Sequence, residues 1–363
     1  MLAAVLRDSI AKCGVDAKEV QDIAVGNVLQ PGGGAHTSRM GGFLADIPYT
    51  ASLYGLNRQC SSGLQAVASI ANQIKCGQID LGIGAGVENM SNFSMQGVVL
   101  PDLLADEVFE NEQARNCLMG MGVTSDNVAK EYGVTREEQD EFAAASQAKA
   151  LAAQENGDLG AEITPVKTKI VDKDGKEHAI TVTKDEGVRK GTTAAKLSKL
   201  KPAFNPDGTT TAGNASQVTD GAAAVILARR STADRLGLKV LGRFHGFATA
   251  GVPPHVMGIG PAYAIPEVLK QTGFTVGDID VFEVNEAFAS QALFSAKKLG
   301  IPTEKLNPRG GAIALGHPLG ATGARQIVTL FHELKKQNKR YGCTSMCIGT
   351  GMGAAGVFER EDF

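Results

Sequence analysis

The chain has 363 residues, of which 43% are hydrophobic and 21% are charged. This balance is typical of a globular protein that buries a large core in two or three domains. Lys and Arg number 36 against 39 Asp and Glu, a net charge of −3, which gives no global electrostatic support for binding nucleic acid or an anionic membrane. No apolar run reaches the roughly 20 residues of a membrane span, so we expect no membrane insertion.

Six cysteines stand at positions 13, 60, 76, 117, 343 and 347, without any CxxC spacing. Zinc sites and secreted disulfide frameworks usually show paired cysteines at short, regular spacings. The pattern therefore predicts no bound metal and favours a reducing compartment.

The first 90 residues alternate between helical and strand patterns. Apolar residues at helical spacing predict a helix over 2–13, which Gly14 ends. A short buried strand is predicted at 22–29, a helix from Cys60 to about Lys75, and another strand at 79–87. Strands that alternate with helices in this way predict an α/β fold with a parallel sheet.

The segment 91–213 differs in composition and pattern from the residues before it, which predicts an insertion. Thr135 begins a capping box, which predicts the start of a long Ala- and Gln-rich helix through Ala153. A charged stretch over 171–183 alternates like an exposed hairpin. The buried-strand pattern resumes at 221–227, so we assign residues 1–90 and 214–236 to one domain that the insertion interrupts.

Two short sequence patterns occur twice. Asp-Ile-x-Val-x-x-Val stands at 22–28 and again at 278–284, and Gly-Ala-Ala-x-Val stands at 221–225 and again at 353–357. Matching anchors in the same order predict two copies of one α/β unit. Residues 237–363 form the second copy. Chance similarity between short apolar strands is the alternative explanation.

The duplication also predicts an absent element. In the second copy a strand-like stretch at 239–248 precedes the first helix, whereas in the first copy the helix begins at Leu2. We therefore expect the first strand of the N-terminal half to be missing, and we expect it to be an inner strand of a parallel sheet. Its loss would leave unpaired backbone groups and an apolar cavity.

Four polar or nucleophilic side chains stand at the ends of predicted elements. Cys60 lies at a helix start, where unpaired N–H groups and the helix dipole favour a thiolate, although a buried capping cysteine is the plainer alternative. His317 lies at the matching glycine-rich turn of the second copy. Asn285 follows a buried strand, and Cys347 stands at a strand end. If the copies pack about a pseudo-twofold axis, these groups meet in one crevice.

The residues around these groups resemble the motifs of the thiolase family. They are Asn-Arg-Gln-Cys60-Ser-Ser-Gly, Asn285-Glu-Ala-Phe, Gly-Gly-Ala-Ile-Ala-Leu-Gly-His317-Pro and Cys347-Ile-Gly-x-Gly. The resemblance spans about residues 2–359 and is strongest to the peroxisomal 3-ketoacyl-CoA branch. It implies a thiolase-like α/β fold of two duplicated halves, with mostly parallel five-stranded sheets in layered α/β/α packing, plus an inserted loop domain.

The same resemblance implies a reaction in fatty acid β-oxidation, in which CoA cleaves a 3-ketoacyl-CoA to acetyl-CoA and a shortened acyl-CoA. Cys60 would be the nucleophile, His317 its base, and Cys347 the residue that protonates the departing enolate. The family assigns one oxyanion to His317 and a water held by Asn285, and the other to the backbone N–H groups of Cys60 and Gly349.

The resemblance also implies substrate contacts. CoA would be a co-substrate bound by the loop domain, with no permanently bound cofactor. Three residues are expected at CoA, although they could equally be a solvated charge, a core aromatic and a turn serine: Arg189, Phe204 and Ser216. Three further residues are expected to contact the substrate or CoA: Met121, Met257 and Phe288. A homodimer and a peroxisomal location are implied as well.

Several alternatives stay open. Asn285 argues against ketoacyl synthases and sterol-carrier-linked thiolases, which carry His there. Gly120 stands where bacterial acetoacetyl-CoA thiolases have His, which favours longer substrates. An acetoacetyl-CoA thiolase working in the condensing direction remains possible, as does a non-catalytic acyl-CoA-binding fragment because of the absent strand. Cys117 is either an unpaired buried cysteine or a partner that forms a disulfide with Cys60 under oxidation.

Overall fold

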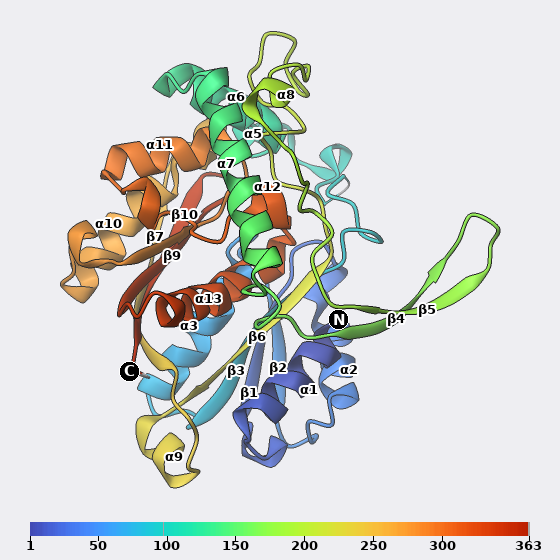
Figure 1. The fold of residues 1–363 in the computed structure, drawn as a ribbon, viewed down its shortest axis with the longest axis vertical. Coiled ribbons are helices and arrows are strands. Elements are labelled where there is room, and N and C mark those ends of the chain that lie inside the picture. The colour runs from blue at the N-terminus through green and yellow to red at the C-terminus, as the bar shows by residue number, and fades with distance from the viewer. Residues whose placement is uncertain (97, 362–363) are drawn as a thin grey trace.

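The computed structural model describes residues 1–96 and 98–361, which form five layers, helix–sheet–helix–sheet–helix (Figure 1). The strands are β1 (Asp22–Gly26), β2 (Ser52–Leu56), β3 (Leu81–Glu88), β4 (Val166–Val171), β5 (Glu177–Val182), β6 (Gly221–Ala228), β7 (Gly242–Gly251), β8 (Val281–Val284), β9 (Tyr341–Ile348) and β10 (Met352–Arg360). The helices are α1 (Leu2–Cys13), α2 (Ala35–Leu44), α3 (Ser62–Lys75), α4 (Asp106–Glu110), α5 (Glu112–Asn116), α6 (Met121–Tyr132), α7 (Arg136–Glu155), α8 (Ala194–Leu197), α9 (Arg230–Arg235), α10 (Pro261–Thr272), α11 (Ala289–Leu299), α12 (Ala312–Leu315) and α13 (Leu319–Lys336).

Three predicted helices are confirmed, and each shows the sequence feature that predicted it. α1 ends at Gly14, which takes the left-handed conformation (φ 74°) that glycine adopts without a steric penalty. α7 begins at the predicted capping box, with Thr135 and Glu138 each bonding the other's backbone N–H. α3 buries its predicted apolar face, including Leu64 and Val67.

Each half of the molecule contains one main sheet. The first has the order β2-β1-β3-β6, in which β6 runs antiparallel to β3 and the other pairs are parallel. The second has the order β7-β10-β9-β8, in which β8 and β9 are parallel and the β9–β10 and β10–β7 pairs are antiparallel. β6 and β10 occupy equivalent places, since each pairs antiparallel with the last parallel strand of its unit.

Two details of the predicted sheets are wrong. The second main sheet has four strands among the described residues rather than five, whereas four were expected in the first. In the second half the segment beside β8 pairs only at a single bridge, Phe282 to Leu306, directly after a short 3-10 turn. The absent strand was also expected inside the sheet, but its counterpart β7 is an edge strand beside β10. The corresponding edge of β6 has no partner strand among the described residues.

The central layer consists of α3 and α13, one from each half. Their backbones approach closely at two glycines. A Cβ on Gly63 would lie 2.7 Å from the Gly320 carbonyl oxygen, and a Cβ on Gly323 would lie 2.3 Å from the Leu64 nitrogen. Such approaches exclude any larger residue. This contact sets the Cys60 turn, which precedes α3, against the His317 turn, which precedes α13.

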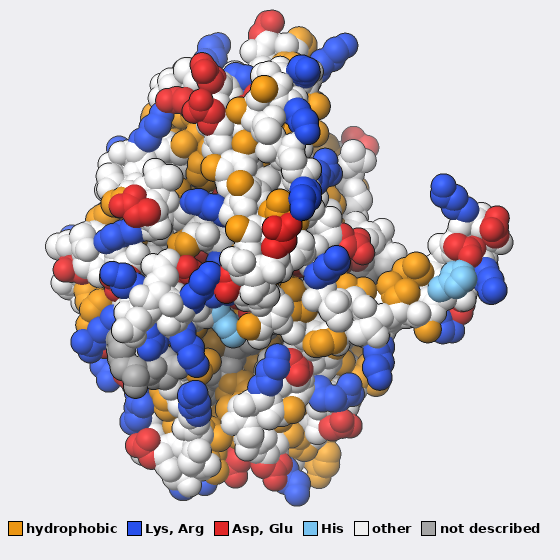
Figure 2. Space-filling view, viewed as in Figure 1, with side chains coloured by type: hydrophobic (Ala, Val, Ile, Leu, Met, Phe, Trp, Pro, Cys, Tyr) orange, Lys and Arg blue, Asp and Glu red, His pale blue; other side chains and the backbone are white. Residues whose placement is uncertain are grey.

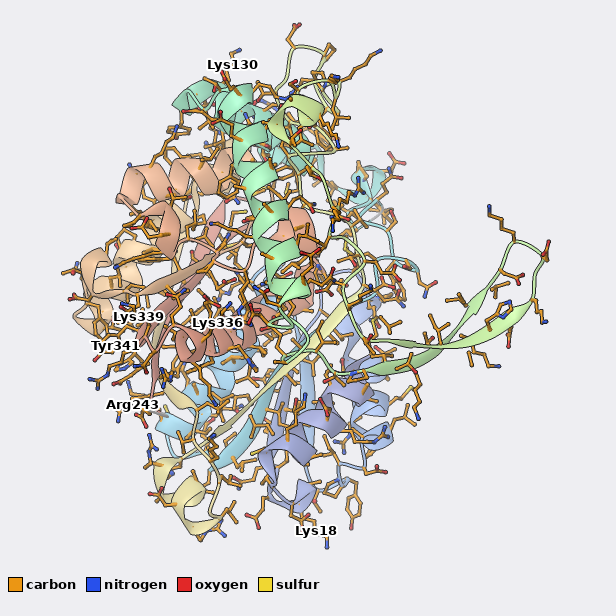
Figure 3. All side chains as sticks on the ribbon, viewed as in Figure 1. Lys18, Lys130, Arg243, Lys336, Lys339 and Tyr341 are labelled. Atoms are coloured by element: carbon orange, nitrogen blue, oxygen red, sulfur yellow. The ribbon has the colours of Figure 1, made fainter. Side chains whose placement is uncertain are left out.

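The insertion contributes α4 to α8 and the hairpin β4–β5. α6 and α7 pack mainly on the second half, against α11 and α12. The hairpin begins at Val166, five residues before the predicted stretch, and it projects from the body of the molecule (Figure 1). Most of the side chains of the hairpin are exposed to solvent. Lys130, near the end of α6, and Lys18 lie at opposite ends of the molecule (Figure 3). No helix in the described part of the chain is long and apolar enough to cross a bilayer.

Candidate active site

Cys60 lies in a tight turn between β2 and the first residue of α3. Gln59, just before it, has a positive φ of 48°, which is uncommon for a residue with a side chain. The Ser62 amide donates to the Gln59 carbonyl at 2.9 Å, and the Gln59 side chain donates to the hydroxyl of Thr350 at 3.0 Å. Thr350 belongs to the loop after β9, so this bond fixes the cysteine turn to the second half of the chain.

The backbone N–H groups of Gly349 and of Cys60 itself face the Cys60 sulfur, and both lower the pKa of the thiol. Burial is the larger effect and raises the pKa of Cys60 to about 11. The thiolate predicted from the helix start is therefore not the favoured form of Cys60, which is a neutral thiol at neutral pH. The two predicted oxyanion donors, however, converge on the sulfur.

His317 is buried at the N-terminal end of α13. Its Nδ1 lies 2.7 Å from the hydroxyl oxygen of Thr322, one turn along the helix, and its Nε2 lies 3.3 Å from Nδ2 of Asn285. Burial, with a smaller contribution from the Arg325 charge, lowers the pKa of His317 to about 3. The site therefore favours a neutral imidazole, which can accept a proton.

Asn285 follows β8 as predicted and is fully buried. Gln291 donates to its backbone carbonyl at 2.6 Å, and its backbone N–H donates to the Ser345 carbonyl at 2.8 Å. Its side-chain Oδ1 has no hydrogen-bond partner within the described residues. A buried amide with unused capacity, next to a histidine, can hold a water or a substrate oxygen.

Cys347 is buried at the end of β9 and belongs to the same site. Burial raises its pKa, and the nearby Cys60 thiol adds to this shift. It packs with three residues predicted to contact the substrate or CoA: Met121, Met257 and Phe288. The structure thus brings together an apolar wall and a second thiol.

The residues expected at CoA lie farther out. Phe204 is 49% exposed, and its ring meets that of Phe288 edge-on at a centroid separation of 6.4 Å. The Ser216 amide donates to the Ala287 carbonyl at 2.9 Å, directly beside Phe288. The Arg189 side chain is exposed on the insertion. Phe204 and Ser216 therefore border the apolar wall, and no described contact joins Arg189 to it.

Two buried carboxylates that hold the turns in place were missed as site residues. Glu88, at the end of β3, accepts from the Val28, Leu29 and Gly320 amides at 3.0–3.2 Å and so ties the first half to the start of α13. Glu286, which the sequence marks only as a polar residue after a strand, accepts from the Ser146 hydroxyl at 2.6 Å. Thr322 could have been found, because it lies in the glycine-rich motif that contains His317.

Cys117 is half-buried, and all six cysteines are free. Its sulfur lies 3.9 Å from the carbonyl oxygen of Thr350, in the loop that also contains Gly349. The disulfide with Cys60 stays a prediction. Within residues 1–96 and 98–361 there is no cluster of three or more side chains suited to hold a metal ion.

The site geometry can now be set beside known proteins. A model of the thiolase N-terminal domain matches residues 1–231, and a model of the thiolase C-terminal domain matches residues 238–360. The chain belongs to the thiolase family.

Individual thiolases match over nearly the whole chain. The peroxisomal 3-ketoacyl-CoA thiolase of Homo sapiens is 56% identical over 99% of this chain and 84% of its own length. That of Yarrowia lipolytica is 55% identical over 99% of this chain and 87% of its own. The crystal structure of the dimeric peroxisomal thiolase of Saccharomyces cerevisiae superposes with a TM-score of 0.90 at 50% identity, covering 99% of this chain and 90% of that one. The predicted thiolase fold class is thereby confirmed.

Proposed function

We propose that this thiolase is a 3-ketoacyl-CoA thiolase of fatty acid β-oxidation, which uses CoA to cleave a 3-ketoacyl-CoA to acetyl-CoA and a shortened acyl-CoA. The observation that carries the proposal is the proximity of the buried Cys60 and Cys347 thiols, with the backbone N–H groups of Cys60 and Gly349 beside the Cys60 sulfur. Relatives that are 55–57% identical over 99% of the chain bear the name of this activity.

In the first half-reaction, His317 takes the Cys60 proton while the sulfur attacks the 3-keto carbon. The carbon–carbon bond then breaks, the shortened acyl group stays on Cys60, and Cys347 gives its proton to the departing acetyl-CoA enolate. In the second half-reaction Cys347 takes the proton of an incoming CoA thiol, whose sulfur attacks the acyl group and releases Cys60. The neutral imidazole of His317 and the two high-pKa thiols suit this exchange of protons.

Two oxygens gain negative charge along this path. The Cys60 and Gly349 N–H groups stabilise one of them, and His317 with a water on Asn285 stabilises the other. Removing a single preorganised donor of this kind costs about 2.7–4 kcal/mol of barrier. The buried Asn285 Oδ1 without a partner supports this role, because it leaves the amide free to hold a water.

For substrate binding, we assign the acyl chain to the wall formed by Met121, Met257 and Phe288. CoA lies along Phe204 and Ser216 at the rim of this wall, with Arg189 at the nucleotide end. In this assignment residues 91–213 form the CoA-binding loop domain inserted into the first half, 1–90 with 214–236, and 237–363 form the second half. The names of the relatives support a homodimer in the peroxisome.

Product analysis tests the activity. The purified chain is incubated with CoA and either acetoacetyl-CoA or a long-chain 3-ketoacyl-CoA, and acetyl-CoA and the shortened acyl-CoA are quantified by chromatography. We expect acetyl-CoA and the shortened acyl-CoA in equal amounts from the long-chain substrate and two acetyl-CoA from each acetoacetyl-CoA, and complete loss of thiolysis in Cys60→Ala. Cys76→Ala is the matched control, because Cys76 is exposed at the far end of the same helix. Without CoA, mass spectrometry should find the acyl group on Cys60.

Other outcomes would select the alternatives. A folded chain that binds acyl-CoA without cleaving it would be the non-catalytic binding protein. Activity confined to acetoacetyl-CoA, with net condensation of acetyl-CoA, would identify the condensing thiolase. Wild-type thiolysis by Cys60→Ala would exclude the acyl-cysteine mechanism.

A further inference from the structure

The segment that follows the exposed hairpin carries a concentration of positive charge. Residues 184–201 contain six Lys or Arg side chains, all of them exposed, and two Asp or Glu. Figure 2, in the same view as Figure 1, shows Lys and Arg side chains over this part of the insertion, beside α7. The nucleotide end of CoA carries phosphate groups, so this segment, which includes Arg189, suits that end of CoA.

The same segment packs directly on the turn that leads to His317. A Cβ on Gly187 would lie 2.4 Å from the Ala314 carbonyl oxygen, so the two backbones touch and a larger residue would push them apart. Ala314 belongs to α12, which ends at Leu315, just before the histidine. The segment expected at the nucleotide of CoA is therefore in contact with the part of the chain that presents the base.

Gln147, on α7, bonds both sides of this contact. Its side-chain oxygen accepts from the Arg189 N–H at 2.8 Å, and its side-chain nitrogen donates to the Ile313 carbonyl of α12 at 3.2 Å. The residue is buried, so these bonds are shielded from competing water. A single side-chain amide therefore fixes the segment 187–189 relative to α12.

Gln217 holds α12 independently of Gln147. Its side chain also donates to the Ile313 carbonyl, at 3.0 Å, and its backbone carbonyl accepts from the His317 N–H at 3.0 Å. α12 and the histidine turn therefore keep these bonds when Gln147 is replaced. The Arg189 N–H, in contrast, bonds to Gln147 alone among the described residues.

We propose that Gln147 is a positioning residue, which fixes the segment at the nucleotide end of CoA to the turn that presents His317. The inference rests on the proposed function, in particular on the assignment of Arg189 to the nucleotide. When this segment binds the nucleotide, the thiol at the other end of CoA is held at a set distance from the acyl group on Cys60. Binding energy gained at the remote nucleotide is thereby used to orient the reacting thiol.

The second half-reaction provides the test. The full chain is acylated on Cys60 with a 3-ketoacyl-CoA in the absence of CoA, and gel filtration removes the small molecules. The acylated chain is then mixed with CoA or with pantetheine, which has the same thiol arm but no nucleotide. Rapid quenching and chromatography give kcat/KM for acyl transfer to each thiol. In the wild-type chain we expect CoA to exceed pantetheine by about hundredfold or more.

Gln147→Met nearly keeps the size of the side chain and removes both of its hydrogen bonds. It should lower kcat/KM with CoA by about tenfold or more. With pantetheine the change should stay below about threefold, because pantetheine does not reach Arg189 and Gln217 still holds α12. Gln139→Met is the matched control, since Gln139 is a buried glutamine of the same helix whose hydrogen bonds reach neither 187–189 nor α12.

Gly187→Ala is an independent second variant, which alters an irregular segment and keeps the interior of α7 intact. Its new Cβ would push the segment away from Ala314, so it should show the same selective loss with CoA. Circular dichroism checks that each variant is folded, and Gly187→Ala decides the question if Gln147→Met does not fold.

Several results would overturn the inference. Equal losses with both thiols in Gln147→Met would show that the residue only supports the fold, and an unchanged rate with CoA would show that the segment needs no such bond. The same selective loss in Gln139→Met would assign the effect to α7 as a whole. A wild-type chain that reacts equally well with CoA and pantetheine would reject the nucleotide contact alone. A wild-type chain that forms no acyl group on Cys60 would instead refute the proposed function, and this inference with it.

Discussion

Replacing Thr322 with valine tests whether the histidine depends on its neighbour on α13. Thr322 is fully buried, and its hydroxyl oxygen lies 2.7 Å from His317 Nδ1. Valine has nearly the same shape but no hydroxyl, so Thr322→Val removes this bond without opening a large cavity. It leaves Nδ1 buried and unpaired, which costs about 1–3 kcal/mol.

Because this hydrogen bond holds the His317 imidazole in its orientation, its loss should appear as a slower reaction. At about 1.4 kcal/mol for each factor of ten in rate, kcat should fall about fivefold to hundredfold. KM should change little, because Thr322 lies behind the histidine and touches no residue that we assign to the substrate. Initial rates of acetyl-CoA formation over a range of 3-ketoacyl-CoA concentrations separate kcat from KM.

Thr322→Ser is the control, because serine restores the hydroxyl and should recover most of the lost rate. Thermal unfolding of both variants shows whether the change also loosens α13. A Thr322→Val enzyme with wild-type kcat would refute the orienting role. An equal loss in the serine variant would assign the effect to packing instead.

Two further predictions concern the interior. In Gly63→Ala the new Cβ would lie 2.7 Å from the Gly320 carbonyl oxygen, so α3 must shift. We expect denaturant unfolding to show a loss of about 1–3 kcal/mol in stability, together with a lower kcat. Unchanged stability would show that α3 and α13 can move apart without cost. Burial raises the pKa of Glu283 to about 8, despite Arg325 beside it, so the folded state holds a proton that the unfolded chain releases near pH 4.5. The free energy of unfolding should therefore fall as pH rises from about 4.5 to 8, and Glu283→Gln should flatten this dependence; a variant with the same slope would assign the dependence to other groups.

The sequence predicted the elements of the site well because their signals are local. Glycine-rich turns next to apolar periodicity marked the Cys60 and His317 turns, and the repeated Asp-Ile-x-Val pattern marked two equivalent units. The contact between these turns followed from the duplication alone. The structure places Cys60 with Gly349 and Cys347, and His317 with Asn285, as the motifs imply.

Other features depend on contacts that no local pattern encodes. From the sequence, Glu88 is only the last residue of a strand. Its hydrogen-bond partners lie in the loop after β1 and at the start of α13, and the latter is 232 residues away. Strand order is equally non-local. The duplication predicted that the counterpart of β7 is an inner strand, whereas the pairing of β7 with β10 places β7 at an edge. The pKa of Cys60 depends on burial, which outweighs the helix start that the sequence displayed.

The site is built so that neither half suffices for the chemistry. One donor to the Cys60 sulfur comes from the first half and the other, Gly349, from the second. The Gln59–Thr350 bond joins residues that both have positive φ, so each turn holds the other in a conformation that neither favours alone. The same bond connects the residue before Cys60 to the residue after Gly349, so it ties together the two segments that carry the donors. A change that breaks this bond should therefore act on catalysis through the distance between two backbone N–H groups.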